Sequence, residues 1–140
     1  MFWFYFYQEK GLFYVLGSGK LRLNPFINLV EIFQEELKKD PSLCILAEFR
    51  EAVPEFSIPV FSAAVQEHRD KFSPPKKMAL LVGGKLGYGL ARLYQQNREK
   101  HGEEGFVNVF MERDEACKWL GLPDDWQPPS QEMLQAVTDQ

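Results

Sequence analysis

The chain has 140 residues, of which 45% are hydrophobic and 26% are charged. This length fits one domain with a single core, and the composition is that of a globular protein rather than a disordered one. The 16 Lys and Arg residues are outnumbered by 20 Asp and Glu residues, which gives a net charge of -4. No overall basic field exists to attract a phosphate backbone, so we expect no nucleic-acid partner.

The aromatic run Met1–Tyr7 is the longest of its kind in the chain. It is too short to cross a bilayer, which needs about 20 apolar residues, and it lacks the basic start and the cleavage site of a signal peptide. We therefore expect no membrane partner and a cytoplasmic location.

Neither the cysteines nor the histidines form a metal-binding motif. Cys44 and Cys117 lie far apart in the sequence, as do His68 and His101, and none of these separations is typical of a zinc or redox site. We interpret both cysteines as buried, reduced thiols. The sequence predicts no metal and no cofactor.

The N-terminal region predicts a β-hairpin. The aromatic stretches Phe2–Tyr7 and Leu12–Leu16 flank a short polar turn that ends in Gly11. Glycine readily takes the positive φ that a tight connection between two strands requires.

Two helices are predicted from their start and stop signals. Asn24 followed by Pro25 is a typical helix start, because Asn caps free N–H groups and Pro at the first position has no N–H to satisfy. The next such start is Ser57, and Pro41 and Pro74 end the two helices.

The rest of the core alternates between strands and helices. Apolar runs between turn residues predict buried strands, whereas the apolar period of 3.6 predicts helices. Asp114 is the expected cap of the last helix. The expected elements are strands at 43–49, 78–82 and 106–111 and helices at about 86–100 and 114–120.

The resulting fold class is α/β, because strands that alternate with helices need crossover connections. We expect a mainly parallel mixed sheet of four to six strands, opened by an antiparallel hairpin and covered by about four helices. Residues 1–121 form this domain. Residues 122–140 contain Pro123, Pro128 and Pro129 and are expected to form a tail outside the core, in which Ser130 caps a final helical turn.

Several motifs of the chain resemble the STAS, or SpoIIAA-like, family of bacterial proteins related to anti-sigma-factor antagonists. The motifs are Met78–Val82, Tyr88–Tyr94, Val109–Phe110 and Glu115–Gly121, and they occur in the order typical of the family. The resemblance covers residues 11 to 121. It implies a non-catalytic regulatory or protein-interaction module whose partner is a regulatory protein.

Phosphoregulated members of this fold carry Asp-Ser-x-Gly at the start of the helix after the third strand. The corresponding residues here are Phe56, Ser57, Ile58 and Pro59. Because Phe56 replaces the aspartate, we interpret Ser57 as a helix cap rather than a phosphoacceptor.

A glycine-rich turn at 83–89 provides the main candidate for a ligand site. Exposed N–H groups at Gly84, the charge of Lys85, the ring of Tyr88 and the guanidinium of Arg92 would together hold an anionic or partly apolar ligand. The alternative is structural: the glycines let the helix pack closely on the sheet, and Arg92 pairs with Glu48 or Glu51. We favour the structural interpretation.

Glu48 is a further candidate for the ligand site, because it lies near the carboxyl end of a buried strand. Ligands of open α/β sheets bind at that end. Glu48 and Arg50 are two residues apart, so their side chains point to the same face. Without a nucleophile or a base partner for Glu48, we expect no catalysis.

The aromatic side chains of Met1–Tyr7 alternate between the two faces of the expected strand. One face packs on the core, and the other is covered either by the tail or by a second subunit in a homodimer. Two functions remain open at this point. The first is the non-catalytic regulatory module, and the alternative is a carrier or sensor of a small anionic or partly apolar molecule.

Overall fold

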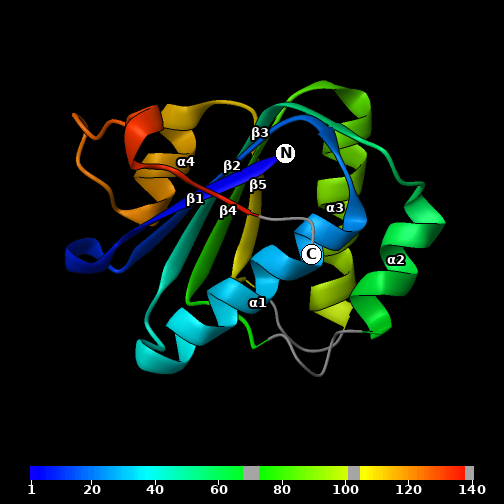
Figure 1. The fold of residues 1–140 in the computed structure, drawn as a ribbon, viewed down its shortest axis with the longest axis horizontal. Coiled ribbons are helices and arrows are strands. Elements are labelled where there is room, and N and C mark those ends of the chain that lie inside the picture. The colour runs from blue at the N-terminus through cyan, green and yellow to red at the C-terminus, as the bar shows by residue number, and fades with distance from the viewer. Residues whose placement is uncertain (68–72, 101–104, 138–140) are drawn as a thin grey trace.

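The computed structural model describes residues 1–67, 73–100 and 105–137. Its six-stranded sheet has the order β5-β4-β3-β2-β1-β6. Strands β2 to β5 are parallel to one another, whereas β1 is antiparallel to both β2 and β6. The α/β fold and the mainly parallel mixed sheet are thereby confirmed (Figure 1). The main elements are β1 (Phe2–Tyr7), β2 (Leu12–Leu21), α1 (Leu23–Lys39), β3 (Cys44–Pro54), α2 (Ile58–Glu67), β4 (Lys77–Val82), α3 (Gly84–Lys100), β5 (Val107–Phe110), α4 (Arg113–Leu120) and β6 (Gln135–Ala136).

The expected hairpin opens the sheet. Strands β1 and β2 are joined by one short 3-10 helix, Gln8–Lys10, and by Gly11. Gly11 has a φ of 59°, the left-handed conformation that other residues rarely adopt. The prediction made from Gly11 is confirmed.

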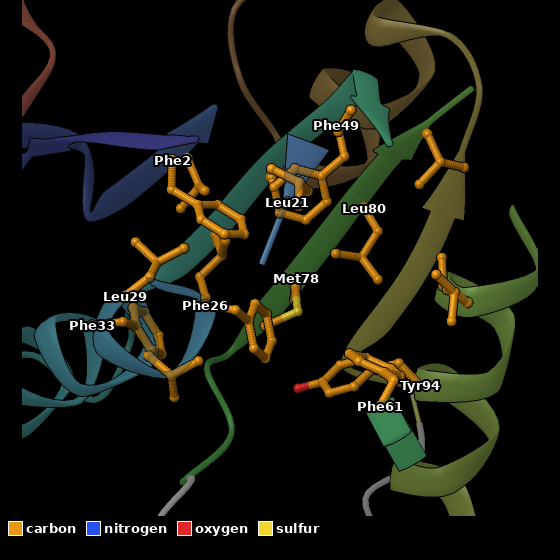
Figure 2. Close-up of a pocket in the computed structure, with 18 of the residues that line it drawn as sticks. Phe2, Leu21, Phe26, Leu29, Phe33, Phe49, Phe61, Met78, Leu80 and Tyr94 are labelled. Atoms are coloured by element: carbon orange, nitrogen blue, oxygen red, sulfur yellow. The ribbon is translucent and has the colours of Figure 1, made fainter. Parts of the chain in front are cut away.

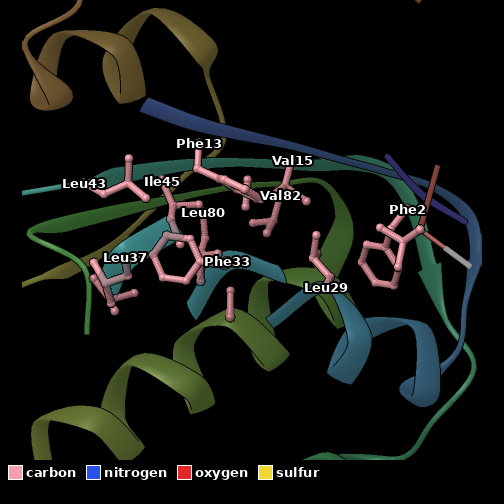
Figure 3. Close-up of a cluster of buried hydrophobic side chains, with 14 of the residues drawn as sticks. Phe2, Phe13, Val15, Leu29, Phe33, Leu37, Leu43, Ile45, Leu80 and Val82 are labelled. Carbon is pink, nitrogen blue, oxygen red and sulfur yellow. The ribbon is translucent and has the colours of Figure 1, made fainter. Parts of the chain in front are cut away.

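The two faces of the sheet are covered by different helices (Figure 1). Helix α1 packs on β1 and β2 and α3 on β3 to β5, with α2 against α3, whereas α4 lies on the opposite face. The larger core cluster lies between the sheet and α1, where Phe33 of α1 meets Phe13 of β2 edge to face (Figure 3). A smaller cluster lies under α4, around Tyr14 and Ala116.

Strands β2 and β3 are longer than the sequence indicates. Beyond Leu16 and Glu48 they continue as a parallel pair to Leu21 and Pro54, after a register shift between Leu16 and Ser18. The sequence of this extension is rich in Gly and charged residues, which hides its strand character.

Helix starts were predicted with mixed success. The backbone N–H of Val60 donates to Ser57 Oγ over 3.3 Å, so Ser57 caps α2 as predicted. Helix α1 instead begins one residue before Asn24, and α4 one residue before Asp114, and in neither does a side chain cap the helix. Asn24 and Asp114 thus lie inside the first turn.

Residues 122–137 pack on the sheet, so for this part of the tail the expectation that it lies outside the core is wrong. Trp126 is only 8% exposed and contacts the rings of Tyr7 and Tyr14, at 6.1 and 6.0 Å between centroids. Strand β6 then pairs with Trp3 and Phe4 of β1. The prolines keep the segment extended, which suits a chain that runs along a surface. Next to Ser130 a single 3-10 turn forms, without a side-chain cap.

None of the helices in the described ranges is long and apolar enough to cross a membrane.

Candidate functional site

A cavity of about 140 Å³ lies between the sheet and helices α1 to α3 (Figure 2). Strands β3 and β4 supply its floor, where Ala47 and Leu80 lie side by side in the parallel register. Phe26 of α1 and Leu90 of α3 also line it. The cavity is therefore held by the elements that form the main core.

Small residues explain why this space is not filled. Ala47 on β3 and both Gly87 and Ala91 on α3 border the cavity. Ala has only a methyl group and Gly has no side chain, so these three positions fill little of the space between α3 and the sheet.

Two groups of aromatic rings border the cavity, one at each end. At one end the rings of Phe49 and Phe2 meet edge to face, with 5.9 Å between their centroids. At the other end Phe61 stacks on Phe56 at 5.6 Å and contacts Tyr94 at 6.4 Å. Figure 2 shows Phe2 and Phe49 on one side of the cavity, and Phe61 and Tyr94 on the other.

Few polar groups reach the cavity. Gln34 and Ser73 hold each other through two hydrogen bonds of 3.0 and 3.1 Å. Arg98 is only 2% exposed, and its guanidinium lies 5.4 Å from the ring centre of Phe106. No carboxylate, imidazole or thiol belongs to the described residues that line the cavity. The lining thus suits binding of an apolar group rather than acid-base chemistry.

The residues predicted from the glycine-rich turn lie outside the lining of this cavity. Gly84 begins α3 with a φ of 76°, and Lys85 is exposed. Tyr88 is 44% exposed on the same first turns. A Cβ at Gly83 would lie 3.0 Å from the carbonyl oxygen of Arg50, so this glycine serves close packing of the helix. Anion binding at Gly84, Lys85 and Tyr88 stays a prediction.

Arg92 does not pair with Glu48, so Glu48 is wrong as its expected partner. Its guanidinium donates to Gln95 Oε1, and Gln95 Nε2 donates to the carbonyl of Val107 over 2.9 Å. The reason is topological, because α3 packs on one face of the sheet and the Glu48 carboxylate lies on the other. Arg92 therefore helps to tie α3 to β5.

Glu48 is the centre of a buried charge network under α4. It accepts hydrogen bonds from Tyr14 Oη at 2.6 Å, from Arg50 at 2.5 Å and from Arg113 at 2.8 Å. The prediction that Glu48 and Arg50 share a face is confirmed. Tyr14 and Arg113 were missed, since Arg113 is 65 residues from Glu48 in the chain.

The network keeps Glu48 ionised. Burial alone would raise the pKa of its carboxyl, but the hydrogen bonds from Tyr14, Arg50 and Arg113 outweigh burial and lower that pKa. The pKa of Tyr14 is raised, mainly by burial and then by its bond to Glu48. Both Glu48 oxygens are engaged, so the arrangement holds α4 to the sheet. The expected lack of catalysis stays a prediction.

The remaining predicted features concern Ser57, the thiols and metals. Ser57 is exposed as well as capping α2.

Cys117 is buried, and burial raises the pKa of its thiol, whereas Cys44 is only partly buried. Within the described ranges no group of three His, Cys, Asp or Glu residues could hold a metal ion. His68 and His101 lie outside those ranges.

The chain was compared with protein families, curated proteins and solved structures, and none of them matches it. What is established is the fold itself, an α/β domain with a six-stranded mixed sheet.

Proposed function

We propose that this domain binds a small apolar molecule in the cavity between the sheet and helices α1 to α3. The single observation behind the proposal is the cavity of about 140 Å³ with an almost wholly apolar lining. In another protein, an engineered cavity of about 150 Å³ lined by Leu, Ile and Phe takes up benzene. The space here therefore fits one aromatic ring or an aliphatic group of similar size.

The size of the cavity argues against a simple packing defect. Protein interiors contain few voids larger than a water molecule. The cavity of about 140 Å³ is larger than such voids, and a bound ligand would add contacts to its lining.

The lining also defines the class of ligand. Its aromatic and aliphatic groups would contribute affinity, while the side-chain amide of Gln34 is already engaged with the backbone of Ser73. We therefore propose a molecule that is uncharged over most of its surface. This choice corresponds to the partly apolar ligand of the carrier or sensor alternative.

The test is calorimetric titration of the whole chain with alkylbenzenes, starting from benzene. Ala91→Leu fills space from α3 and should weaken binding without unfolding the protein. Ala63→Leu adds the same carbons at an exposed position of α2 and should leave binding unchanged. Failure of the wild-type chain to bind any alkylbenzene would refute the proposal.

We also propose that the chain is a distant STAS-like domain and acts in the cytoplasm. The support is the order of the elements, a hairpin followed by alternating helices and strands, with Tyr88–Tyr94 on α3 and Glu115–Gly121 on and after α4. A regulatory module with a protein partner stays a prediction, as does the homodimer. Native mass spectrometry of protein purified from its own host would reveal a retained small molecule, a partner protein or a second copy.

A further inference from the structure

Gly17 stands out among the buried residues of β2 because a side chain at its position would fit only if the Phe49 ring moved. A Cβ built there would lie 2.6 and 2.9 Å from two ring carbons of Phe49, and 3.3 Å from a methyl carbon of Leu21. Carbon atoms that are not bonded normally approach to about 3.5 to 4.0 Å. The φ of Gly17 is not positive, so the backbone conformation at this position does not require glycine. The reason for glycine is the ring of Phe49.

The two side chains that press on Gly17 both border the cavity. Phe49 and Leu21 belong to its lining, and Phe49 meets Phe2 edge to face. Figure 2 shows Phe49, Leu21 and Phe2 together, away from Phe61 and Tyr94. The Phe49 ring thus lies partly in the space that a side chain at position 17 would occupy, and this leaves more of the cavity open.

We infer that the contact between Gly17 and Phe49 sets the size of the largest molecule that the cavity accepts. Any side chain at position 17 would push the Phe49 ring away from β2 and into the space that this ring already borders. The cavity would then be shorter at this end, while the end formed by Phe61 and Tyr94 would keep its shape. This inference rests on the proposed function, because it concerns which apolar ligands bind.

The experiment compares Gly17→Ala with the wild-type chain in titrations with benzene, ethylbenzene, propylbenzene and butylbenzene. Burying one more methylene group strengthens binding about fourfold, so affinity should rise along the series until the cavity is full. In Gly17→Ala this limit should come at least one methylene group earlier. The largest alkylbenzene that the wild type binds should lose at least about fourfold in affinity relative to benzene.

Two further variants separate ligand size from general damage. Gly89→Ala is the matched control, because a Cβ there meets no atom within 4 Å and Gly89 does not line the cavity. It should leave the size limit unchanged. Phe49→Leu replaces the ring with a shorter side chain and should move the limit to larger alkylbenzenes, even if Gly17→Ala does not fold.

The outcomes are distinct from those that test the proposed function. If the wild type binds no alkylbenzene, the proposed function itself fails. If it binds the series but neither Gly17→Ala nor Phe49→Leu shifts the size limit, binding stands and the role of Gly17 and Phe49 is refuted. A shift in opposite directions for these two variants supports the inference.

Discussion

The hydroxyl of Tyr14 on β2 donates a hydrogen bond of 2.6 Å to the carboxylate of Glu48 on the neighbouring strand β3. Both side chains are buried, and Glu48 is only 7% exposed. The same carboxylate pairs with two arginines, Arg50 on the same strand and Arg113 at the start of α4. A buried carboxylate with these partners is satisfied only in its charged form.

The first prediction is a loss of stability in acid that depends on Glu48. Its pKa is lowered in the folded chain from the ordinary value of 4.5, because the bonds from Tyr14, Arg50 and Arg113 outweigh burial. Below pH 4.5 the unfolded chain therefore binds this proton more readily, and the stability that Glu48 contributes is lost as the pH falls through its folded pKa. Above that range the contribution is complete.

Urea denaturation of wild type and Glu48→Gln between pH 7 and pH 3 checks this prediction. The wild type should be more stable at pH 7, and the difference between the two chains should shrink below pH 4.5. A difference that stays constant over the whole range would contradict a lowered pKa at Glu48.

The second prediction compares two arginines. Arg113→Met removes a 2.8 Å ion pair and leaves a buried carboxylate with fewer partners, so it should lower the unfolding free energy by about 1.5 to 3 kcal/mol. Arg92→Met removes a hydrogen bond to Gln95 and should lower it by about 0.5 to 1.5 kcal/mol. Chemical denaturation measures the unfolding free energy of both variants. A larger loss in Arg92→Met than in Arg113→Met would show that Arg92 contributes more to stability.

The third prediction concerns Trp126 in the C-terminal segment. Trp126→Ala should destabilise by about 3 to 5 kcal/mol, because a large buried ring is lost between Tyr7 and Tyr14. Trp126→Phe keeps most of that packing and should change stability by less than about 1.5 kcal/mol. An unchanged denaturation midpoint in Trp126→Ala would mean that the segment is detached in solution.

The fourth prediction concerns the helix cap at Ser57. Ser57→Ala removes the acceptor for the Val60 N–H and should lower the unfolding free energy by about 1 kcal/mol. Ser57→Asp supplies another good capping group and should retain stability. Stoichiometric phosphorylation of Ser57 in protein from the native host would instead make this residue a switch.

Local sequence patterns predicted much of the fold. The alternation of apolar runs and helical stripes predicted the parallel sheet, Gly11 predicted the hairpin, and Ser57 predicted the start of α2. Each of these depends on residues that are close in the sequence, where spacing translates directly into geometry. The shared face of Glu48 and Arg50 was accessible for the same reason.

Features that depend on tertiary packing were not accessible from those patterns. Arg113 reaches Glu48 only because α4 folds back across the sheet, and Trp126 is buried only because the proline-rich segment runs along the same face. The cavity is harder still to predict, since Ala47 and Ala91 look like ordinary core residues. Whether small residues leave a space is decided by how far α3 stands from β3.

Glu48 and Phe49 are consecutive residues of β3 whose side chains serve opposite faces of the sheet. Glu48 is fixed by Tyr14 and Arg113, and Phe49 borders the cavity. The backbone between them is therefore the rigid wall of the cavity, because the partners of Glu48 hold it from the opposite face of the sheet. Molecules that differ in shape must be accommodated by rearrangement on the helical side. Backbone amide exchange should accordingly slow on α1 and α3 when the space is filled, while β3 is protected with or without an occupant.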